Sequence, residues 1–167
     1  KPYLLAAKVF YYYRQYQDSI EVIKRAREAE LTRNELDFFE ARNLRYMAQN
    51  RDETEKVLYM CKDLTRKLDD EDNDIEEPVD VYREILLCLM DMREYEKGLE
   101  EATKALLVFP DSDNLLWMKG DLLRKLRKDR DALSIYRTLS TRMENPALIN
   151  DIVECLMDLE PMSQEIP

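Results

Sequence analysis

Apolar residues recur along most of the chain at the three- and four-residue spacing of an α-helix that is buried on one side. The apolar segments come in pairs, and a short polar stretch separates the two members of a pair, as at 92–95 and 127–130. Glycine, which supplies the positive-φ positions of tight β-hairpins, occurs only at Gly98 and Gly120. The pattern therefore predicts an all-α protein made of helical hairpins.

The hairpins repeat at an interval of thirty-four residues. The segment that starts at Tyr82 aligns with the segment thirty-four residues later, so that Leu86 meets Gly120 and Gly98 meets Ala132. Small and apolar residues thus return at fixed places in both helices of the hairpin. A regular interval of this kind is typical of arrays in which each unit buries the face of its neighbour.

The start of the chain follows the same pattern, with Ala7 at the position of Gly120 and Ser19 at that of Gly98. Residues 34–68 fit less closely, because their second helix matches only after a shift of one residue. The repeat pattern therefore covers nearly the whole chain, with one irregular unit.

These positions resemble the tetratricopeptide repeat (TPR) family, whose 34-residue unit is a helix–turn–helix. The family pattern asks for bulky, small and aromatic residues, then a small–aromatic–small series and a closing proline. In the third hairpin these positions are held by Tyr82, Leu89, Tyr95, Gly98, Ala105 and Pro110, and in the fourth by Leu116, Gly120, Leu123, Ala132 and Tyr136. The resemblance implies a right-handed superhelical stack of helix–turn–helix repeats, an α-α superhelix. Another helical-hairpin array or an ordinary helix bundle is the alternative.

The predicted array is one domain over residues 1–160. Its parts are units at 2–33, 34–68, 79–111 and 113–146, a capping helix at 147–159, an acidic insertion at 69–77 and a tail at 161–167. The last helix either caps the array or is the first helix of a fifth unit, because an array needs a cover over its final apolar face.

The acidic insertion at 69–77, hereafter the acidic loop, invites comparison with a calcium site. An EF-hand loop needs a glycine at its sixth position and a carboxylate at its twelfth. Counted from Asp70, these positions hold Ile75 and Val81, and the register that starts one residue earlier also lacks the glycine. The sequence therefore predicts a solvated, mobile loop that could dock a basic partner.

The amino-acid composition excludes several kinds of catalytic and metal site. The chain has 26 Lys and Arg against 36 Asp and Glu, a net charge of −10, and no histidine. Without histidine there is no Ser-His-Asp triad, no Cys-His pair and no His-ligated metal. With 36 acidic residues, close carboxylate pairs are expected by chance. The acidity disfavours nucleic acid and anionic membranes as partners, because both attract positive charge. We therefore predict no catalysis, no cofactor and no metal site.

The three cysteines, Cys61, Cys88 and Cys155, are widely spaced and form no CxxC pair. This usage is typical of small core residues in a reducing compartment, which indicates an intracellular protein, cytoplasmic or nuclear. The longest apolar run, 85–90, is too short to cross a bilayer. Because the first residue is Lys1 rather than Met, we expect a fragment of a longer protein.

The family resemblance implies that the first helix of each unit lines a concave groove. The groove-facing positions of this sequence are Lys8, Tyr11, Tyr12, Phe38, Arg42, Arg45, Tyr46, Arg83, Leu87, Met90, Trp117, Arg124 and Lys125. This set is aromatic and basic in an acidic chain, and Trp, Tyr and Arg often dominate interface energies. It predicts a groove for a peptide or helix with acidic and hydrophobic residues. A solvated helix face is the alternative.

The sequence thus favours a non-enzymatic protein–protein interaction module, an adaptor or scaffold within a multi-subunit complex. The alternative is a structural assembly subunit, a homo-oligomer that self-associates through the edges of its repeats. Apolar residues at the N-terminal edge, including Tyr3, Leu4 and Val9, favour this alternative because a first repeat with a polar cap would not carry them.

Overall fold

The computed structural model describes residues 2–159, which are helical apart from turns and loops. The chain divides into two compact units with the boundary between Met92 and Arg93. Unit 1 contains α1 (Pro2–Tyr12), α2 (Tyr16–Glu28), α3 (Asn34–Met47), α4 (Arg51–Lys67) and α5 (Pro78–Asp91), and unit 2 contains α6 (Tyr95–Val108), α7 (Asp113–Lys125), α8 (Asp129–Ser140) and α9 (Pro146–Leu159). The predicted all-α class is confirmed.

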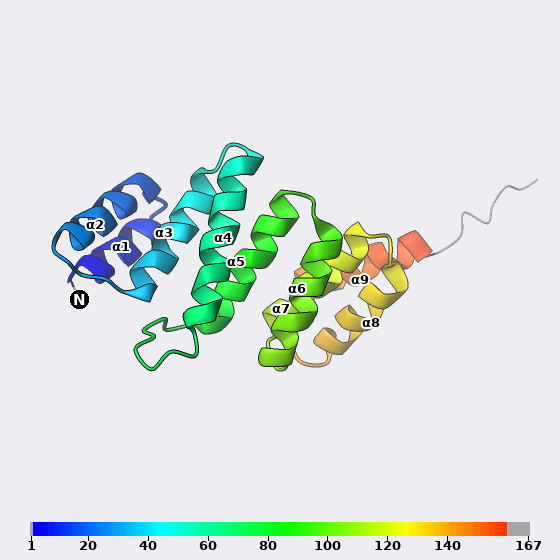
Figure 1. Ribbon diagram of the computed structural model, residues 1–167. Helices are drawn as coiled ribbons and strands as arrows, with labels where there is room; N and C mark the ends of the chain where they lie inside the picture. The colour runs from blue at the N-terminus through cyan, green and yellow to red at the C-terminus, as the bar shows by residue number, and fades with distance from the viewer. Residues whose placement is uncertain (1, 160–167) are drawn as a thin grey trace, which may run out of the picture. The chain divides into compact units, whose positions relative to one another are not determined.

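Helices pack against their neighbours in sequence within each unit (Figure 1). In unit 1, α1 packs on α2 and α3 on α4, and the first helices of the hairpins also contact each other, α1 with α3 and α3 with α5. In unit 2, α7 contacts both α6 and α8, and α9 packs on α8. The unit boundary falls inside the predicted third hairpin, so one domain over 1–160 stays a prediction. The predicted tail at 161–167 lies outside the described residues.

Three of the turns between helices use an arginine in the left-handed conformation. Arg14, Arg93 and Arg127 have φ values of 60°, 58° and 60°. After α7, Arg127 N donates to Arg124 O at 2.9 Å and Lys128 N donates to Leu123 O at 2.9 Å. These bonds satisfy carbonyls at the helix end, which offsets the cost of positive φ in a residue other than glycine. This explains how the chain makes tight helical turns with so few glycines.

Small residues let the paired helices approach closely at the predicted positions. In the first hairpin, Ser19 Oγ donates to the backbone oxygen of Ala7 at 2.9 Å. In the last hairpin, a Cβ atom added to Gly120 would lie 2.5 Å from Cε1 of Tyr136, whose side chain is fully buried. Ser19 and Gly120 therefore mark places where one helix of a hairpin crosses the other, whereas Gly98 of α6 lies against Leu122 of α7.

The acidic loop is anchored to the body of unit 1 at one end, while six of its nine residues are exposed to solvent. Ile75 inserts into the core and is 6 % exposed. Asp74 Oδ1 accepts a hydrogen bond from Glu35 N at 3.1 Å, at the first turn of α3. Glu76 N in turn donates to the Glu35 carboxylate at 3.2 Å. One buried isoleucine and the N–H groups at the start of a helix thus anchor the loop, which the charge pattern did not predict, and the mobility of its exposed part stays a prediction.

All three cysteines are free and buried, as expected for core residues. Cys61 and Cys88 belong to the core of unit 1, and Cys155 to that of unit 2. Burial raises the pKa of the Cys88 thiol to about 12. A thiol with so high a pKa is a weak nucleophile, so these residues serve packing.

Replacing Ala132 by glutamate tests the repeat register, which places Ala132 in the core. Ala132 is 0 % exposed in the core of unit 2, so a carboxylate there would be buried without a partner. We expect a loss of about 3 kcal/mol or more in the free energy of unfolding, measured by urea denaturation followed by circular dichroism. Ser134→Glu, at an exposed position of the same helix, should unfold like the wild type. Equal stability of the two variants would contradict the assigned repeat.

Replacing the two glycines by alanine should change the stability of the fold to different extents. The Cβ of Gly120→Ala would meet the ring of buried Tyr136 at 2.5 Å, whereas the Cβ of Gly98→Ala would meet the flexible end of Leu122 at 2.7 Å. We expect Gly120→Ala to destabilise by about 1–3 kcal/mol through overpacking. Gly98→Ala should stay within about 1 kcal/mol of the wild type, because the gain in helix propensity offsets a small shift of Leu122. Thermal unfolding of both variants checks this order.

Candidate functional site

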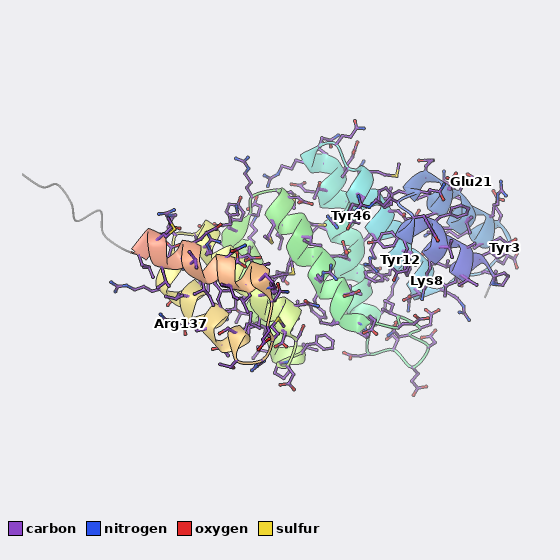
Figure 2. All side chains as sticks on the ribbon, turned by 180° about the vertical axis from the view of Figure 1, so that it is seen from behind. Tyr3, Lys8, Tyr12, Glu21, Tyr46 and Arg137 are labelled. Atoms are coloured by element: carbon purple, nitrogen blue, oxygen red, sulfur yellow. The ribbon has the colours of Figure 1, made fainter. Side chains whose placement is uncertain are left out.

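An aromatic cluster lies on α1, the start of α2 and α3 in unit 1. The ring of Tyr11 meets that of Phe39 edge-on at 5.3 Å between centroids, and Tyr16 stacks on Tyr46 at 4.9 Å and 4° between planes. Tyr12 and Tyr46 keep 67 % and 50 % of their surface exposed. Figure 2 shows Tyr46, Tyr12 and Lys8 one after another across this part of the unit. The cluster thus has a buried base and two accessible tyrosines.

Glu84 joins α5 to two arginines of α3. Its carboxylate is 2 % exposed, accepts a hydrogen bond from Arg45 Nε at 2.6 Å, and lies 3.4 Å from Arg42 Nε. Burial alone would lower the pKa of Arg45, but the Glu84 carboxylate outweighs burial and raises this pKa. The Arg42 guanidinium also lies 4.6 Å from the centroid of the Tyr11 ring, within cation–π range. These contacts fix α3 against α5.

Lys8 is held in the same way by the acidic loop and by α3. Its Nζ lies 3.0 Å from Glu35 Oε1 and 2.6 Å from Glu76 Oε2. Burial alone would lower the pKa of Lys8, but the hydrogen bonds to Glu76 and Glu35 raise it. The ammonium group is therefore charged and occupied by internal partners.

The positive charges predicted for the groove are thus neutralised within unit 1. The side chains of Lys8, Arg42 and Arg45 are only 10–17 % exposed, and each has an acidic partner. Phe38 and Tyr11, also predicted to line the groove, are 2 % and 7 % exposed. Because these five side chains are largely buried, a partner could not contact them directly. They pack beneath the exposed residues of the surface.

The α5 positions of the predicted groove remain partly accessible. The Arg83 side chain is 41 % exposed and makes one ion pair, with Asp80 of the same helix at 3.5 Å. Leu87 and Met90 are half-buried beside it along the helix. With Tyr12 and Tyr46, these are the accessible residues among the predicted groove positions of unit 1, and together they are called the tyrosine face here.

In unit 2, two of the three predicted groove residues of α7 donate hydrogen bonds to α9. Trp117 Nε1 donates to Asp151 Oδ2 at 2.8 Å, and Arg124 Nη2 donates to Glu154 Oε2 at 2.7 Å. Lys125, the last predicted residue, is exposed. The Trp117 and Arg124 side chains therefore attach the last helix.

Sequence reasoning missed the acidic partners of these basic and aromatic residues. A signal was present for one of them, because Asp151 follows Trp117 by thirty-four residues, one repeat interval. Glu84 carries no such signal, since its separation of thirty-nine residues from Arg45 includes part of the acidic loop insertion.

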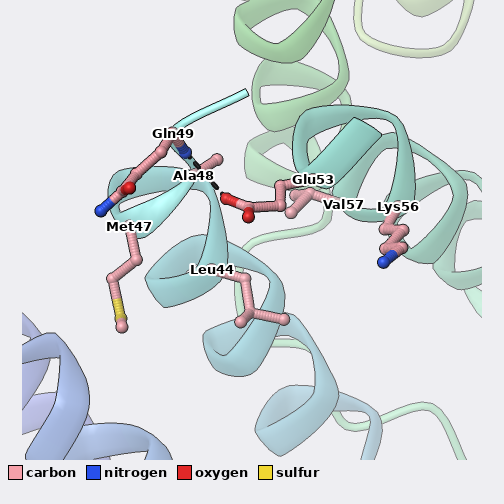
Figure 3. Close-up of a pocket in the computed structure, with 7 residues that line it drawn as sticks. All are labelled: Leu44, Met47, Ala48, Gln49, Glu53, Lys56 and Val57. Carbon is pink, nitrogen blue, oxygen red and sulfur yellow. Dashed lines mark hydrogen bonds between the residues drawn. The ribbon is translucent and has the colours of Figure 1, made fainter. Parts of the chain in front are cut away.

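The second hairpin contains a pocket that the sequence did not predict (Figure 3). It has a volume of about 480 Å³ and lies between the end of α3 and the start of α4. The residues that line it are Leu44, Met47, Ala48, Gln49, Glu53, Lys56 and Val57. Gln49 N donates to Glu53 Oε2 at 2.8 Å across the rim. The backbone leaves α3 at Ala48 with ψ 126° instead of an arginine in the left-handed conformation, which matches the irregular fit of residues 34–68.

The ionisable groups of unit 2 have structural roles. The Tyr136 hydroxyl donates to Asp121 Oδ1 at 2.6 Å, and burial raises the pKa of Asp121. Among residues 2–159, no group of acidic and cysteine side chains has the arrangement of a metal site. No helix in that same range combines the length and the apolar character needed to cross a membrane.

Solved structures share this fold, whereas no protein-family model and no curated protein matches the sequence. The structure titled MamA AMB-1, crystal form P212121, aligns with a TM-score of 0.66 and 11 % identity over 93 % of this chain and 78 % of that chain. MamA MSR-1, form C2, aligns with a TM-score of 0.65 and 11 % identity over 93 % and 82 %. MamA is TPR-like, so the expected TPR-like superhelical fold is confirmed. At this level of identity the likeness concerns the fold.

Glu84→Gln tests the role of the buried carboxylate. Without its charge, Arg42 and Arg45 keep only Asp80 and Asp91 as more distant acidic partners, at 3.8 and 3.5 Å. We expect a loss of about 3 kcal/mol in the free energy of unfolding, measured with urea. The control, Glu76→Gln, changes a side chain that is 67 % exposed and should cost less than about 1 kcal/mol. Similar costs for the two variants would show that Glu84 does not fix α3 to α5.

Proposed function

We propose that this chain is a non-enzymatic protein–protein interaction module that holds a peptide or helix of a partner on the tyrosine face. The accessible side chains at the centre are Tyr12 and Tyr46, and Arg83, Leu87 and Met90 extend the face along α5. Because the fold is shared with TPR-like proteins, partner binding on first helices is the function that it most directly supports.

One observation carries the proposal: two exposed tyrosines are each packed against another aromatic ring. Tyr46 stacks on Tyr16, and Tyr12 lies edge-on to Tyr11 with 5.4 Å between centroids. Large aromatic side chains that are already fixed lose little conformational entropy on binding. Tyrosine is also among the residues that contribute most to interface energies.

The expected partner is more apolar than the sequence pattern suggested. Lys8, Arg42 and Arg45 are paired internally, so they add little attraction for an acidic peptide. Arg83 is the accessible cation of the face, and its pairing with Asp80 is exposed and therefore weak. We expect a peptide with aromatic or aliphatic anchors and an acidic residue opposite Arg83.

Self-association through the repeat edges is the second candidate function. It is favoured by exposed apolar residues at the two ends of the described chain, such as Leu5 on α1 and Ile149 on α9, which are 65 % and 58 % exposed.

Selection from a displayed peptide library tests the tyrosine face. Peptides enriched on the wild-type chain should lose binding by tenfold or more to the double variant Tyr12→Ala with Tyr46→Ala, because each tyrosine is expected to contribute more than about 1 kcal/mol. Affinities are measured by fluorescence anisotropy with a synthetic peptide. Tyr59→Ala, which removes a tyrosine that is 68 % exposed on α4, is the matched control and should bind normally.

Two results would contradict the proposal. Either no peptide is enriched, or the selected peptides lose affinity equally for the Tyr59→Ala control. Arg83→Glu tests the electrostatic contribution to peptide affinity, since it should weaken the binding only of peptides that contain an acidic residue. Arg124 is unsuited to this test, because its reversal would place three acidic groups together with Asp151 and Glu154.

A further inference from the structure

The pocket between α3 and α4 is separate from the tyrosine face. None of the seven residues that line it belongs to that face. Its volume of about 480 Å³ lies in the range of small-molecule sites. Such sites are typically apolar hollows with a few polar groups that fix the orientation of the ligand. The chemistry of the lining therefore indicates which ligand the pocket fits.

The pocket lies where the second hairpin departs from the repeat. At the position of Ala48, the other three hairpins place an arginine: Arg14, Arg93 and Arg127. Ala48 has a small side chain, and the backbone leaves α3 there with ψ 126°. The interval from Ala41 to Thr54 is also one residue longer than that from Ala7 to Ser19. The smaller side chain and the longer interval leave space between the end of α3 and the start of α4.

Apolar side chains form one part of the wall (Figure 3). They belong to Leu44, Met47, Ala48 and Val57. Leu44 and Val57 also pack in the core that α3, α4 and α5 share, so this part of the wall is fixed. Met47 is 36 % exposed, and its flexible thioether side chain can adapt to the shape of a ligand.

Glu53 is the acidic residue of the lining, and its carboxylate is used within the protein. Its Oε2 accepts a hydrogen bond from Gln49 N at 2.8 Å, and its Oε1 accepts one from Asn50 Nδ2 at 2.9 Å. Asn50 in turn caps α4, because its side chain accepts from Glu53 N at 3.0 Å. These reciprocal bonds resemble a capping box. Glu53 therefore stabilises the start of α4.

Lys56 is the other charged residue of the lining, and its ammonium group is unused. Within residues 2–159 no hydrogen bond or ion pair involves this side chain, which is exposed. Lys8, by contrast, is held by two carboxylates. With Thr54 aligned to Ser19, the other hairpins carry no cation at the position of Lys56 but Glu21, Glu100 and Ser134. The pocket thus combines an apolar wall with one unpaired positive charge.

We propose that this pocket binds a small monocarboxylate with an apolar chain or ring. The carboxylate pairs with the Lys56 ammonium group, which gains a charge-assisted hydrogen bond. The apolar part lies on Leu44, Met47 and Val57, where it is removed from water. An uncharged apolar molecule would leave Lys56 without a partner, and an amine would be repelled by its charge. This site goes beyond partner binding on the tyrosine face and does not depend on it.

An NMR titration of the ¹⁵N-labelled chain with octanoate tests the site. The amide signals of Met47, Ala48 and Gln49 should shift, with a dissociation constant of about 1 mM, which a ligand of about ten non-hydrogen atoms can supply. Octylammonium has the same chain and the opposite charge, and should bind about threefold more weakly or less. The acetylated dipeptide amide Leu-Glu carries both groups on a peptide backbone and should also bind more weakly than octanoate.

Three variants identify the groups that bind octanoate. Lys56→Gln should weaken its binding about threefold and remove the preference over octylammonium. Ala48→Trp should abolish the shifts, because the indole fills the pocket. Lys24→Gln is the matched control, since it removes an exposed positive charge from α2 outside the pocket and should bind octanoate like the wild type. Circular dichroism should show unchanged folding of all three variants.

Several results would overturn the proposal. One is the absence of shifts at the three amides, and another is equal affinity for octanoate and octylammonium. A third is equal affinity of Lys56→Gln and Lys24→Gln for octanoate. Tighter binding of the dipeptide amide than of octanoate would also overturn it, because it would assign the pocket to a partner protein. Peptides selected on the tyrosine face should bind Ala48→Trp like the wild type, so the two proposals can fail separately.

Discussion

Within each of the two units, every helix buries its apolar side against the helices next to it in sequence, and the other features of the fold follow from that constraint. The helices of a hairpin can share a core only where a small residue allows a close approach, as at Gly120 against Tyr136. Stability is then a sum of local contacts between neighbours. Among the described residues, α1 and α9 both carry exposed apolar residues, such as Leu5 and Ile149.

The same constraint explains what could be predicted from the sequence. Packing between neighbours imposes a fixed spacing of small and large residues, so the helices and their interval could be deduced from positions such as Ala7, Ser19 and Ala132. The left-handed turns were less visible, because arginine at Arg14, Arg93 and Arg127 takes a conformation that favours glycine. Backbone hydrogen bonds at the helix end make that choice possible.

The candidate site was only partly predictable, because its electrostatics depend on residues of other helices. Arg42 and Arg45 look like free charges when α3 is considered by itself. Their partner, Glu84, is supplied by α5 across the acidic loop insertion, and no spacing rule connects them. Because Arg42 and Arg45 are buried and paired, their charges stabilise the packing of α3 on α5 and are not available to bind a partner. The exposed tyrosines remain because nothing within unit 1 covers them.

The exposed apolar residues of α1 and α9 limit how strong self-association through them can be. Completing the burial of a half-exposed apolar side chain gains about 1 kcal/mol. The six exposed residues Leu5, Val9, Ile149, Val153, Leu156 and Met157 together therefore supply about 6 kcal/mol before any cost of association. A dissociation constant of 1 μM requires about 8 kcal/mol, and the loss of translational freedom reduces the gain further. Self-association through these six residues alone is therefore weaker than micromolar and reversible. Its strength would depend on a high local concentration of the chain, as within a larger assembly where several copies are held together.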